Sequence, residues 1–182
     1  MFHRRPRIQA NPLTPDQLAI LIKANQWMSE GNPSDAGPLF AELADAMQHS
    51  NHPRRAANLY ARAAHAFADG NNEQAALKYA RTALALFTQF NMLRRTLIFF
   101  TNITNKMKAK GMNVAAEALQ REFGAQIATQ PVTSRQVNRL QRGLLPTNCP
   151  KCGAVVNSDE ADWVDDNTVE CEYCGTLIRT EN

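Results

Sequence analysis

The chain has 182 residues, of which 44% are hydrophobic and 20% charged, enough for one good core and a small additional module. No stretch approaches the roughly 18 consecutive apolar residues of a membrane-spanning helix, so the chain is not expected to span a membrane. The net charge of +3 hides an asymmetry, because residues 1–148 carry 18 Lys and Arg against 9 Asp and Glu, whereas residues 149–182 carry 2 against 8.

After an N-terminal tail at 1–12, helical patterns fill a predicted domain at 13–126. Thr14-Pro15-Asp16-Gln17 has the pattern of a capping box with proline at the first helical position. Leu18, Leu21, Ile22 and Met28 follow at helical spacing, and Gly31 should end this first helix.

Five further helices are expected. Ser34 or Asp35 should cap the second, whose apolar stripe includes Phe40 and Leu43 and which should break near residue 51. The next two should cover about 53–68 and 72–90. A fifth begins near 93 and ends before Gly111, and a shorter one runs from 113 to 123 with Gly124 as its stop.

The middle of this domain contains an internal repeat. When Ala57 is aligned to Ala76, the same offset also matches Tyr60 with Tyr79 and Arg62 with Arg81. Small residues beside one tyrosine per helix favour close antiparallel packing. A series of small and large positions also recurs, at Leu43-Ala44, Ala46-Met47, Ala56, Tyr60 and Ala63, and in a second, imperfect copy at Gly70, Ala75-Ala76, Tyr79 and Ala83. Over roughly 35–90 these positions resemble the tetratricopeptide repeat, and this resemblance implies a scaffold whose groove binds peptides or protein surfaces.

A connector is expected at 127–148. Ser134 can cap a short helix that Gly143 and Pro146 end. Arg135, Arg139 and Arg142 would share one face of that helix. This basic stripe either binds an acidic partner or is an amphipathic connector whose arginines are solvated or pair with the acidic C-terminal part.

All four cysteines lie from position 149 onward, in two Cys-x-x-Cys-Gly segments. Their spacing is typical of a structural zinc site with Cys149, Cys152, Cys171 and Cys174 as ligands. Four thiolates would complete a tetrahedron around one ion and leave no open position for a substrate. Iron is a less favoured metal for the same ligand set.

Two disulfides are the other possible use of four cysteines, but they belong to oxidising compartments. The chain shows no apolar run suited to a signal peptide, so a cytoplasmic protein is expected.

Residues 149–182 are similar to zinc ribbons. Strands are predicted at 154–156, at Trp163-Val164 and at 168–170. Trp163 is expected to fill the small core or, in the alternative, to anchor a partner. The complete prediction is a mainly α protein: an antiparallel helical-hairpin, tetratricopeptide-like array with a small C-terminal β zinc ribbon.

These features favour a non-enzymatic adaptor that binds protein partners. No phosphate-binding loop, His-Glu-x-x-His or nucleophile elbow is present, so no catalytic residue is predicted. His49, His52 and His65, three of the four histidines, are expected to be satisfied or solvent-facing. The alternative function is nucleic-acid binding by the basic helical half, through Arg54-Arg55, Arg94-Arg95, Lys106, Lys108 and Lys110.

Overall fold

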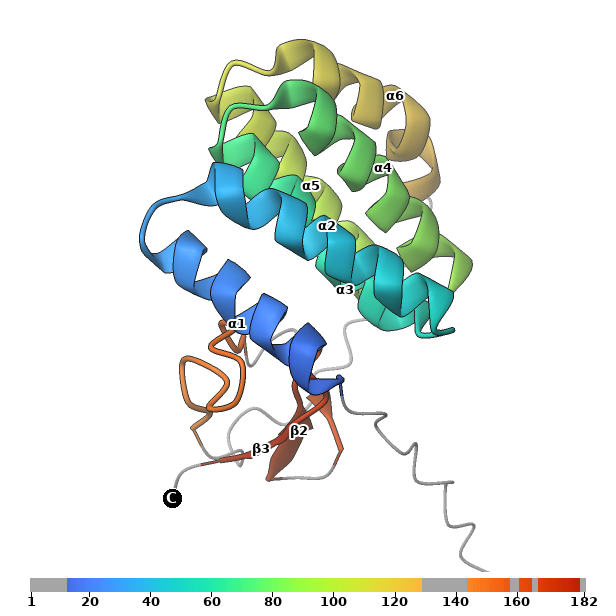
Figure 1. The fold of residues 1–182 in the computed structure, drawn as a ribbon. Helices are drawn as coiled ribbons and strands as arrows, with labels where there is room; N and C mark the ends of the chain where they lie inside the picture. Colours follow the sequence, from blue (N-terminus) through green and yellow to red (C-terminus); the bar gives the residue numbers. More distant parts are fainter. Residues whose placement is uncertain (1–12, 129–143, 158–160, 165–166, 181–182) are drawn as a thin grey trace, which may run out of the picture.

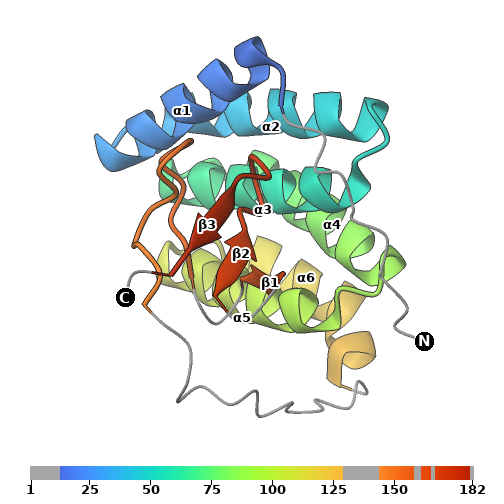
Figure 2. The same cartoon turned by 90° about the horizontal axis from the view of Figure 1, so that it is seen from below.

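The computed structural model describes residues 13–128, 144–157, 161–164 and 167–180. Six helices make up the first of these ranges (Figure 1), and their bounds are as follows: α1 Pro15–Ser29, α2 Pro33–His49, α3 Pro53–Asp69, α4 Glu73–Gln89, α5 Leu93–Ala109 and α6 Asn113–Ala128. Each helix packs antiparallel on its neighbour in the chain, and α3 with α5 and α4 with α6 also touch. The array therefore has two layers, with α1, α3 and α5 in one layer and α2, α4 and α6 in the other (Figures 1 and 2).

The turns between the helices recur at a constant interval, the distance in sequence from Gly31 to Asn51, which we call the helical period. A residue with positive φ stands at each turn, and these residues are Gly31, Asn51, Asn71, Asn91 and Gly111. The backbone N–H of the following residue donates to a carbonyl five residues back, at 2.8 Å in all five turns. Of the two hydrogen bonds in a Schellman motif, this one spans the larger number of residues. The motif ends a helix and satisfies its free carbonyls. Each turn thus ends one helix and starts the next within three residues.

The helical period corrects the predicted repeat. At this period, the fourth residue of each helix from α2 to α6 is small and buried: Ala36, Ala56, Ala76, Thr96 and Ala116. The predicted offset is one residue short, since Tyr60 and Tyr79 do not occupy equivalent positions but stack on each other with ring centroids 6.0 Å apart. Alanine is so frequent in these helices that several offsets give matches.

Two helix ends also differ from prediction. The cap of α2 is Asn32, not Ser34 or Asp35, because Pro33 already fills the first helical position. Helix α6 passes through Gly124 and ends at Ala128, and Ile127 near its end is buried. Burial of this side chain offsets the roughly 1 kcal/mol that a glycine costs inside a helix.

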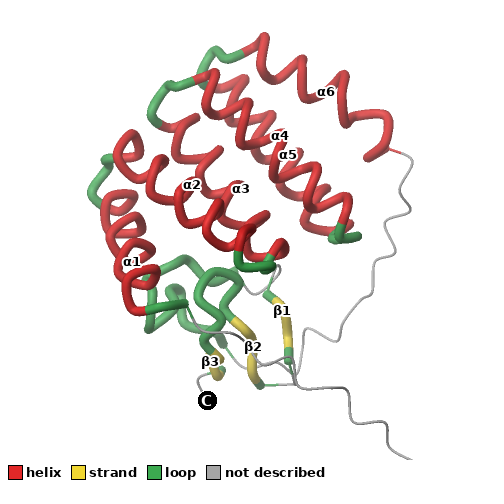
Figure 3. The backbone as a smooth tube through the Cα atoms, turned by 45° about the vertical axis from the view of Figure 1, so that its right-hand side comes forward, coloured by secondary structure: helices red, strands yellow, loops and turns green. Residues whose placement is uncertain are grey.

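The C-terminal module, defined here as the described residues from 144 to 180, contains a three-stranded antiparallel sheet in the order β1-β2-β3. The strands are β1 Asp162–Trp163, β2 Thr168–Glu170 and β3 Leu177–Arg179 (Figure 3). Residues 154–156 do not form the predicted strand, since Val155 makes only an isolated bridge with Asn148. The predicted basic helix with Arg135, Arg139 and Arg142 lies outside the described residues.

The buried side chains of both parts form one continuous core cluster. In the module, Val169 and Ile178 are paired across β2 and β3 and are fully or almost fully buried. Trp163, paired with Val169, is partly buried and packs on this cluster, as the core interpretation expected. The predicted boundaries at 126 and 148 remain predictions.

The asparagines in the turns give a first test. Asn71 has φ 58°, a left-handed conformation that glycine adopts freely and alanine adopts at a cost. We expect Asn71→Ala to lower the free energy of unfolding by about 1 kcal/mol and Asn71→Gly to leave it unchanged or raise it slightly. Thermal and chemical denaturation measure the difference. Asn105→Ala, at an exposed position inside α5, is the control and should leave the free energy of unfolding unchanged or raise it by a few tenths of a kcal/mol, because alanine favours the helix more than asparagine. Equal losses at both positions would contradict the prediction.

Candidate metal centre and its docking face

The two cysteine segments fold into the same turn twice. In each, the glycine after the second cysteine donates its N–H to the carbonyl of the first cysteine at 2.9 Å. The first cysteine in turn donates its own N–H to a carbonyl five residues further on, at 2.8 Å in both segments. Gly153 and Gly175 have φ of 72° and 74°, the left-handed conformation for which the sequence prediction required glycine.

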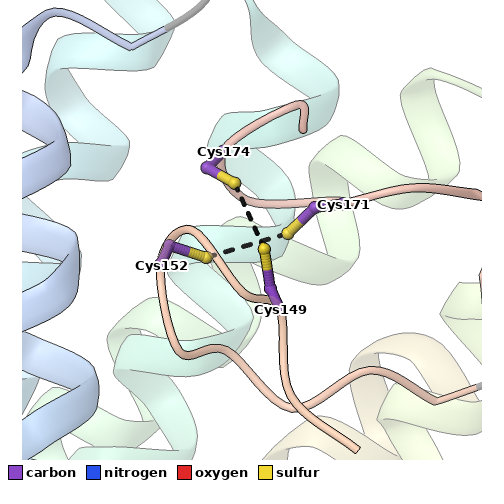
Figure 4. Close-up of side chains that lie close together, drawn as sticks. All are labelled: Cys149, Cys152, Cys171 and Cys174. Carbon is purple, nitrogen blue, oxygen red and sulfur yellow. Dashed lines mark hydrogen bonds between the residues drawn. The ribbon is translucent and has the colours of Figure 1, made fainter. Parts of the chain in front are cut away.

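The turns bring all four sulfurs together. The four Sγ atoms lie within 4.8 Å of one another and all four cysteines are buried. The side chains point to a common centre (Figure 4), with Cys149 Sγ 3.7 Å from Cys174 Sγ and Cys152 Sγ 3.8 Å from Cys171 Sγ. These are free thiols, and the sulfurs are too far apart for the roughly 2.05 Å bond of a disulfide.

The spacing fits a tetrahedral metal ion. Four sulfurs at the usual Zn–S distance of about 2.3 Å would be about 3.8 Å apart along each edge of the tetrahedron. The site can therefore hold one metal ion with no ligand position left for a substrate.

The thiols also perturb one another. A hydrogen bond from Cys152 is the largest influence on Cys149 and lowers the pKa of the Cys149 thiol to about 6, and the same contact raises the pKa of Cys152. Interaction with the neighbouring sulfurs lowers the pKa of Cys174 as well, and the hydroxyl of Thr176, 3.3 Å from its sulfur, can donate to a thiolate there. The pKa is therefore lowered, toward the thiolate form that binds metals, for Cys149 and Cys174, and raised for Cys152 and Cys171.

The module docks on the layer formed by α1, α3 and α5, which we call the inner face (Figure 2). One side chain from each of these helices makes a polar contact with the module. Asn25 of α1 donates its Nδ2 to the carbonyl of Cys152 at 2.8 Å. Arg55 of α3 pairs with Glu170 at 2.8 Å, and Arg95 of α5 pairs with Glu172 at 2.7 Å. The cysteine cluster is therefore directly attached to the helices.

A second group of contacts surrounds Arg62. Its Nη2 donates to Asn25 Oδ1 at 2.5 Å, and its guanidinium lies 5.1 Å from the Tyr173 ring centroid and 5.0 Å from that of Phe40. Burial raises the pKa of Tyr173 to about 12. A cavity of about 240 Å³ remains beside Tyr173, between the module and the helices. Its lining includes Asn58, Arg62, His65, Arg95 and Asn102.

Gly175 gives a prediction with a built-in control. A Cβ there would overlap the guanidinium of Arg55, whereas a Cβ at the equivalent Gly153 would meet nothing closer than Asn25 Cβ at 4.0 Å. Both substitutions by alanine strain a left-handed residue by about 1–2 kcal/mol. We expect Gly175→Ala to lower the free energy of unfolding of the metal-loaded protein by about 1–3 kcal/mol more than Gly153→Ala, because it also disturbs the Arg55–Glu170 pair. In an Arg55→Ala background this excess should vanish, and its persistence there would contradict the explanation.

The basic runs proposed for nucleic acid divide into two groups. Arg54 and Arg94 are exposed. Arg55 and Arg95 are held by the glutamates of the module, and Lys106 pairs with Asp69 at 2.7 Å. The positive charge of the inner face is thus used within the chain.

His65 differs from the expectation of a satisfied or solvent-facing side chain. Within the described part of the chain, its buried Nδ1 has no hydrogen-bond partner, and its ring meets Phe99 edge to face at 5.3 Å. Burial is the main cause that lowers the pKa of His65 to about 4, and Lys106 and Arg62 also lower this pKa while Asp69 raises it.

His65 therefore predicts a pH dependence of stability. In the unfolded chain histidine has a pKa of about 6.5, so between pH 6.5 and 4 the unfolded state binds more protons and stability falls as the pH falls. Between pH 7.5 and 5.5 the wild type should lose about 1 kcal/mol more unfolding free energy than His65→Gln. Chemical denaturation of both proteins at the two pH values measures this difference. Equal losses would contradict a neutral buried His65.

The sequence identified the four cysteines but not the residues that attach their module to the helices. The acidic C-terminal part was expected to pair, if at all, with the connector arginines Arg135, Arg139 and Arg142. Those three residues lie outside the described part of the chain, and within it Glu170 and Glu172 pair with Arg55 and Arg95. Their separation by twice the helical period was the available signal, because it gives both the same place as third residue of a helix on the inner face.

An array of antiparallel helical hairpins with a cysteine cluster near its C-terminus defines a helical-repeat protein of the tetratricopeptide-like class. The family model described as soluble NSF attachment protein, SNAP, matches residues 21–125. The chain belongs to this family, and the predicted helical fold class is confirmed. Comparison with curated proteins and with solved structures finds no match.

Proposed function

We propose that this protein is a non-enzymatic adaptor whose helical array binds a partner protein and whose C-terminal module is a zinc ribbon with a structural ion. The observation that carries the proposal is the helical-repeat fold of the SNAP family over residues 21–125, because such arrays present extended surfaces to other proteins. The identity of the partner is left to experiment.

Zinc is the metal that best suits the four cysteines. A closed set of four thiolates is the usual ligand set of structural zinc, and the Cys149, Cys152, Cys171 and Cys174 sulfurs have the required spacing. When bound, zinc would supply fold stability, since the module's own buried core is small. A reducing compartment such as the cytoplasm would keep these thiols available for the metal. In the described part of the chain, no helix is both long and apolar enough to span a membrane.

Nucleic-acid binding is the weaker candidate. Arg55, Arg95 and Lys106, all among the basic residues proposed for it, are engaged with carboxylates of the same chain. The family match gives it no support.

Affinity capture from a nuclease-treated lysate tests the adaptor. The tagged protein should retain specific proteins, and each retained protein should bind the purified chain directly, measured by calorimetry. Arg54→Gln/Arg94→Gln, at exposed positions outside the ion pairs, is a control for non-specific charge effects. Two results would contradict the adaptor: loss of every bound molecule on nuclease treatment, or binding that weakens steeply with salt in the wild type and less steeply in the Arg54→Gln/Arg94→Gln variant. Nucleic acid would then replace protein as the partner.

Metal analysis tests the ribbon separately. The purified protein should contain one zinc ion per chain and should be colourless. A red protein with one iron ion would instead show an iron–thiolate centre.

A further inference from the structure

The inner face binds an acidic segment of the chain itself. Glu170 and Glu172 stand on either side of the ligand Cys171, and each pairs with an arginine from a different helix. Arg55 and Arg95 are the third residues of α3 and α5, so the helical repeat places two guanidinium groups at equivalent positions of two helices. The inner face therefore recognises two carboxylates that are two residues apart in the bound segment.

An aromatic side chain completes this recognition. Tyr173 directly follows Glu172 and lies against the guanidinium of Arg62, which is fixed by its hydrogen bond to Asn25. Cation–π contacts of this kind favour an aromatic group next to the charged pair. The bound sequence, Glu-x-Glu-Tyr, thus describes the chemistry of a preferred ligand.

The module does not fill the inner face. The cavity of about 240 Å³ beside Tyr173 lies between the helices and the module. Residues of α3 and α5 and Phe87 of α4 line it on one side, and Val155, Asn157, Glu172 and Tyr173 of the module line it on the other. A single water occupies about 30 Å³ in the liquid, so this space is large enough for a substantial group from a better-fitting ligand.

The contacts between module and helices combine a shared buried core with directed polar contacts. Among the described residues, the directed contacts include two ion pairs, one amide hydrogen bond and one cation–π contact. Polar interfaces between parts of one chain are typical of parts that can separate. The opposite charges of residues 1–148 and 149–182 favour re-docking after separation.

We propose that the inner face is a receptor for acidic, aromatic-containing segments of a partner protein, and that the C-terminal module covers it as an intramolecular competitor. This rests on the proposed function as an adaptor and names the chemistry of its partner. A partner must then displace the Glu170–Tyr173 segment. The apparent affinity of the partner equals its intrinsic affinity multiplied by the fraction of molecules with a free inner face, and this fraction is small.

A peptide probe tests the receptor directly. The probe is a fluorescent peptide of residues 168–176 with Cys171 and Cys174 replaced by serine, so that it carries both glutamates and the tyrosine but cannot hold a metal. Its fluorescence anisotropy is measured with the full-length wild type and with Glu170→Gln/Glu172→Gln, which keeps all four cysteines but loses both charges of the competitor. The double variant should bind the peptide at least tenfold more tightly than the wild type.

Matched variants locate the binding site. Adding Arg55→Gln/Arg95→Gln to the double variant should abolish binding, whereas adding Arg54→Gln/Arg94→Gln, one residue earlier on the same helices, should not. A peptide with both glutamates replaced by glutamine should not bind. Circular dichroism and metal content must match the wild type for each variant compared.

Three results would overturn the proposal. The first is equal peptide binding by the wild type and the double variant, which would show that the module covers no receptor. The second is the absence of binding by a correctly folded, metal-loaded double variant. The third is a wild-type dimer that the peptide dissociates, since the occupant would then be the module of a second copy. The adaptor function itself is tested by the lysate and calorimetry experiment. Failure of the peptide to bind therefore contradicts the receptor proposal and does not contradict the adaptor function.

Discussion

Cys171→Ser is expected to remove the bound metal and release the C-terminal module from the helices. Cys171 is buried, with its sulfur 3.8 Å from that of Cys152, so the site has no spare ligand to replace it among the described residues. Structural zinc sites of this size have apparent binding free energies of about 10–16 kcal/mol, most of which is folding free energy of the module. Without the ion the module's small core should not hold its three strands together.

The helices should survive this change. Their turns, caps and buried alanines are formed within α1 to α6, and the module touches them through one face only. Metal analysis should show less than one ion per chain, circular dichroism at 222 nm should change little, and trypsin should cut more rapidly after Lys151 and Arg179. The melting temperature should fall because the inner face loses its cover.

Val155→Ser is the matched control, because it introduces the same residue at an exposed position next to the first cysteine turn. It should retain the metal and the trypsin resistance of the wild type. Retention of a full metal ion by Cys171→Ser would contradict the assignment of the ligand. Loss of all helicity would show that the array cannot fold without the module.

The helices could be predicted from sequence because their signals are local. Proline or asparagine at the start of a helix and glycine or asparagine at its end act within a few residues, and Gly31 and Gly111 ended their helices where expected. The exception at Gly124 arises where tertiary packing overrides a local signal. Gly124 does not end α6 because Ile127 is buried by tertiary packing, which a local signal does not contain.

The cysteine cluster was equally accessible to prediction, because its spacing is a local property of two short turns. Docking of the module was not, since it joins residues far apart in the chain, such as Arg95 and Glu172. Charge asymmetry suggested that the two parts attract each other, but it could not select Arg55 and Arg95 over the exposed Arg54 and Arg94. Only the helical phase, which turns the third residue of α3 and α5 to the inner face, makes that selection.

The Arg95–Glu172 pair should be strongly coupled, and this is the second prediction with a large effect. Its side chains are only 12% and 17% exposed, so removing one partner leaves a charge with little access to water. Breaking such a pair typically costs about 3–5 kcal/mol, whereas replacing both partners costs much less. Arg95→Met and Glu172→Gln should therefore each destabilise the docked, metal-loaded protein by more than the double variant does.

The surface pair Arg81–Glu122 is the internal comparison. Its side chains are 44% and 40% exposed, and pairs of that kind contribute at most about 1 kcal/mol. The same cycle with Arg81→Met and Glu122→Gln should give a small coupling energy that shrinks further in high salt, while the Arg95–Glu172 coupling should persist. Unfolding is followed by tryptophan fluorescence, which reports on α1 through Trp27 and on the module through Trp163. If the two cycles give equal coupling, the module is held mainly by its apolar contacts, and the arginines of the inner face cannot be the groups that select an acidic ligand.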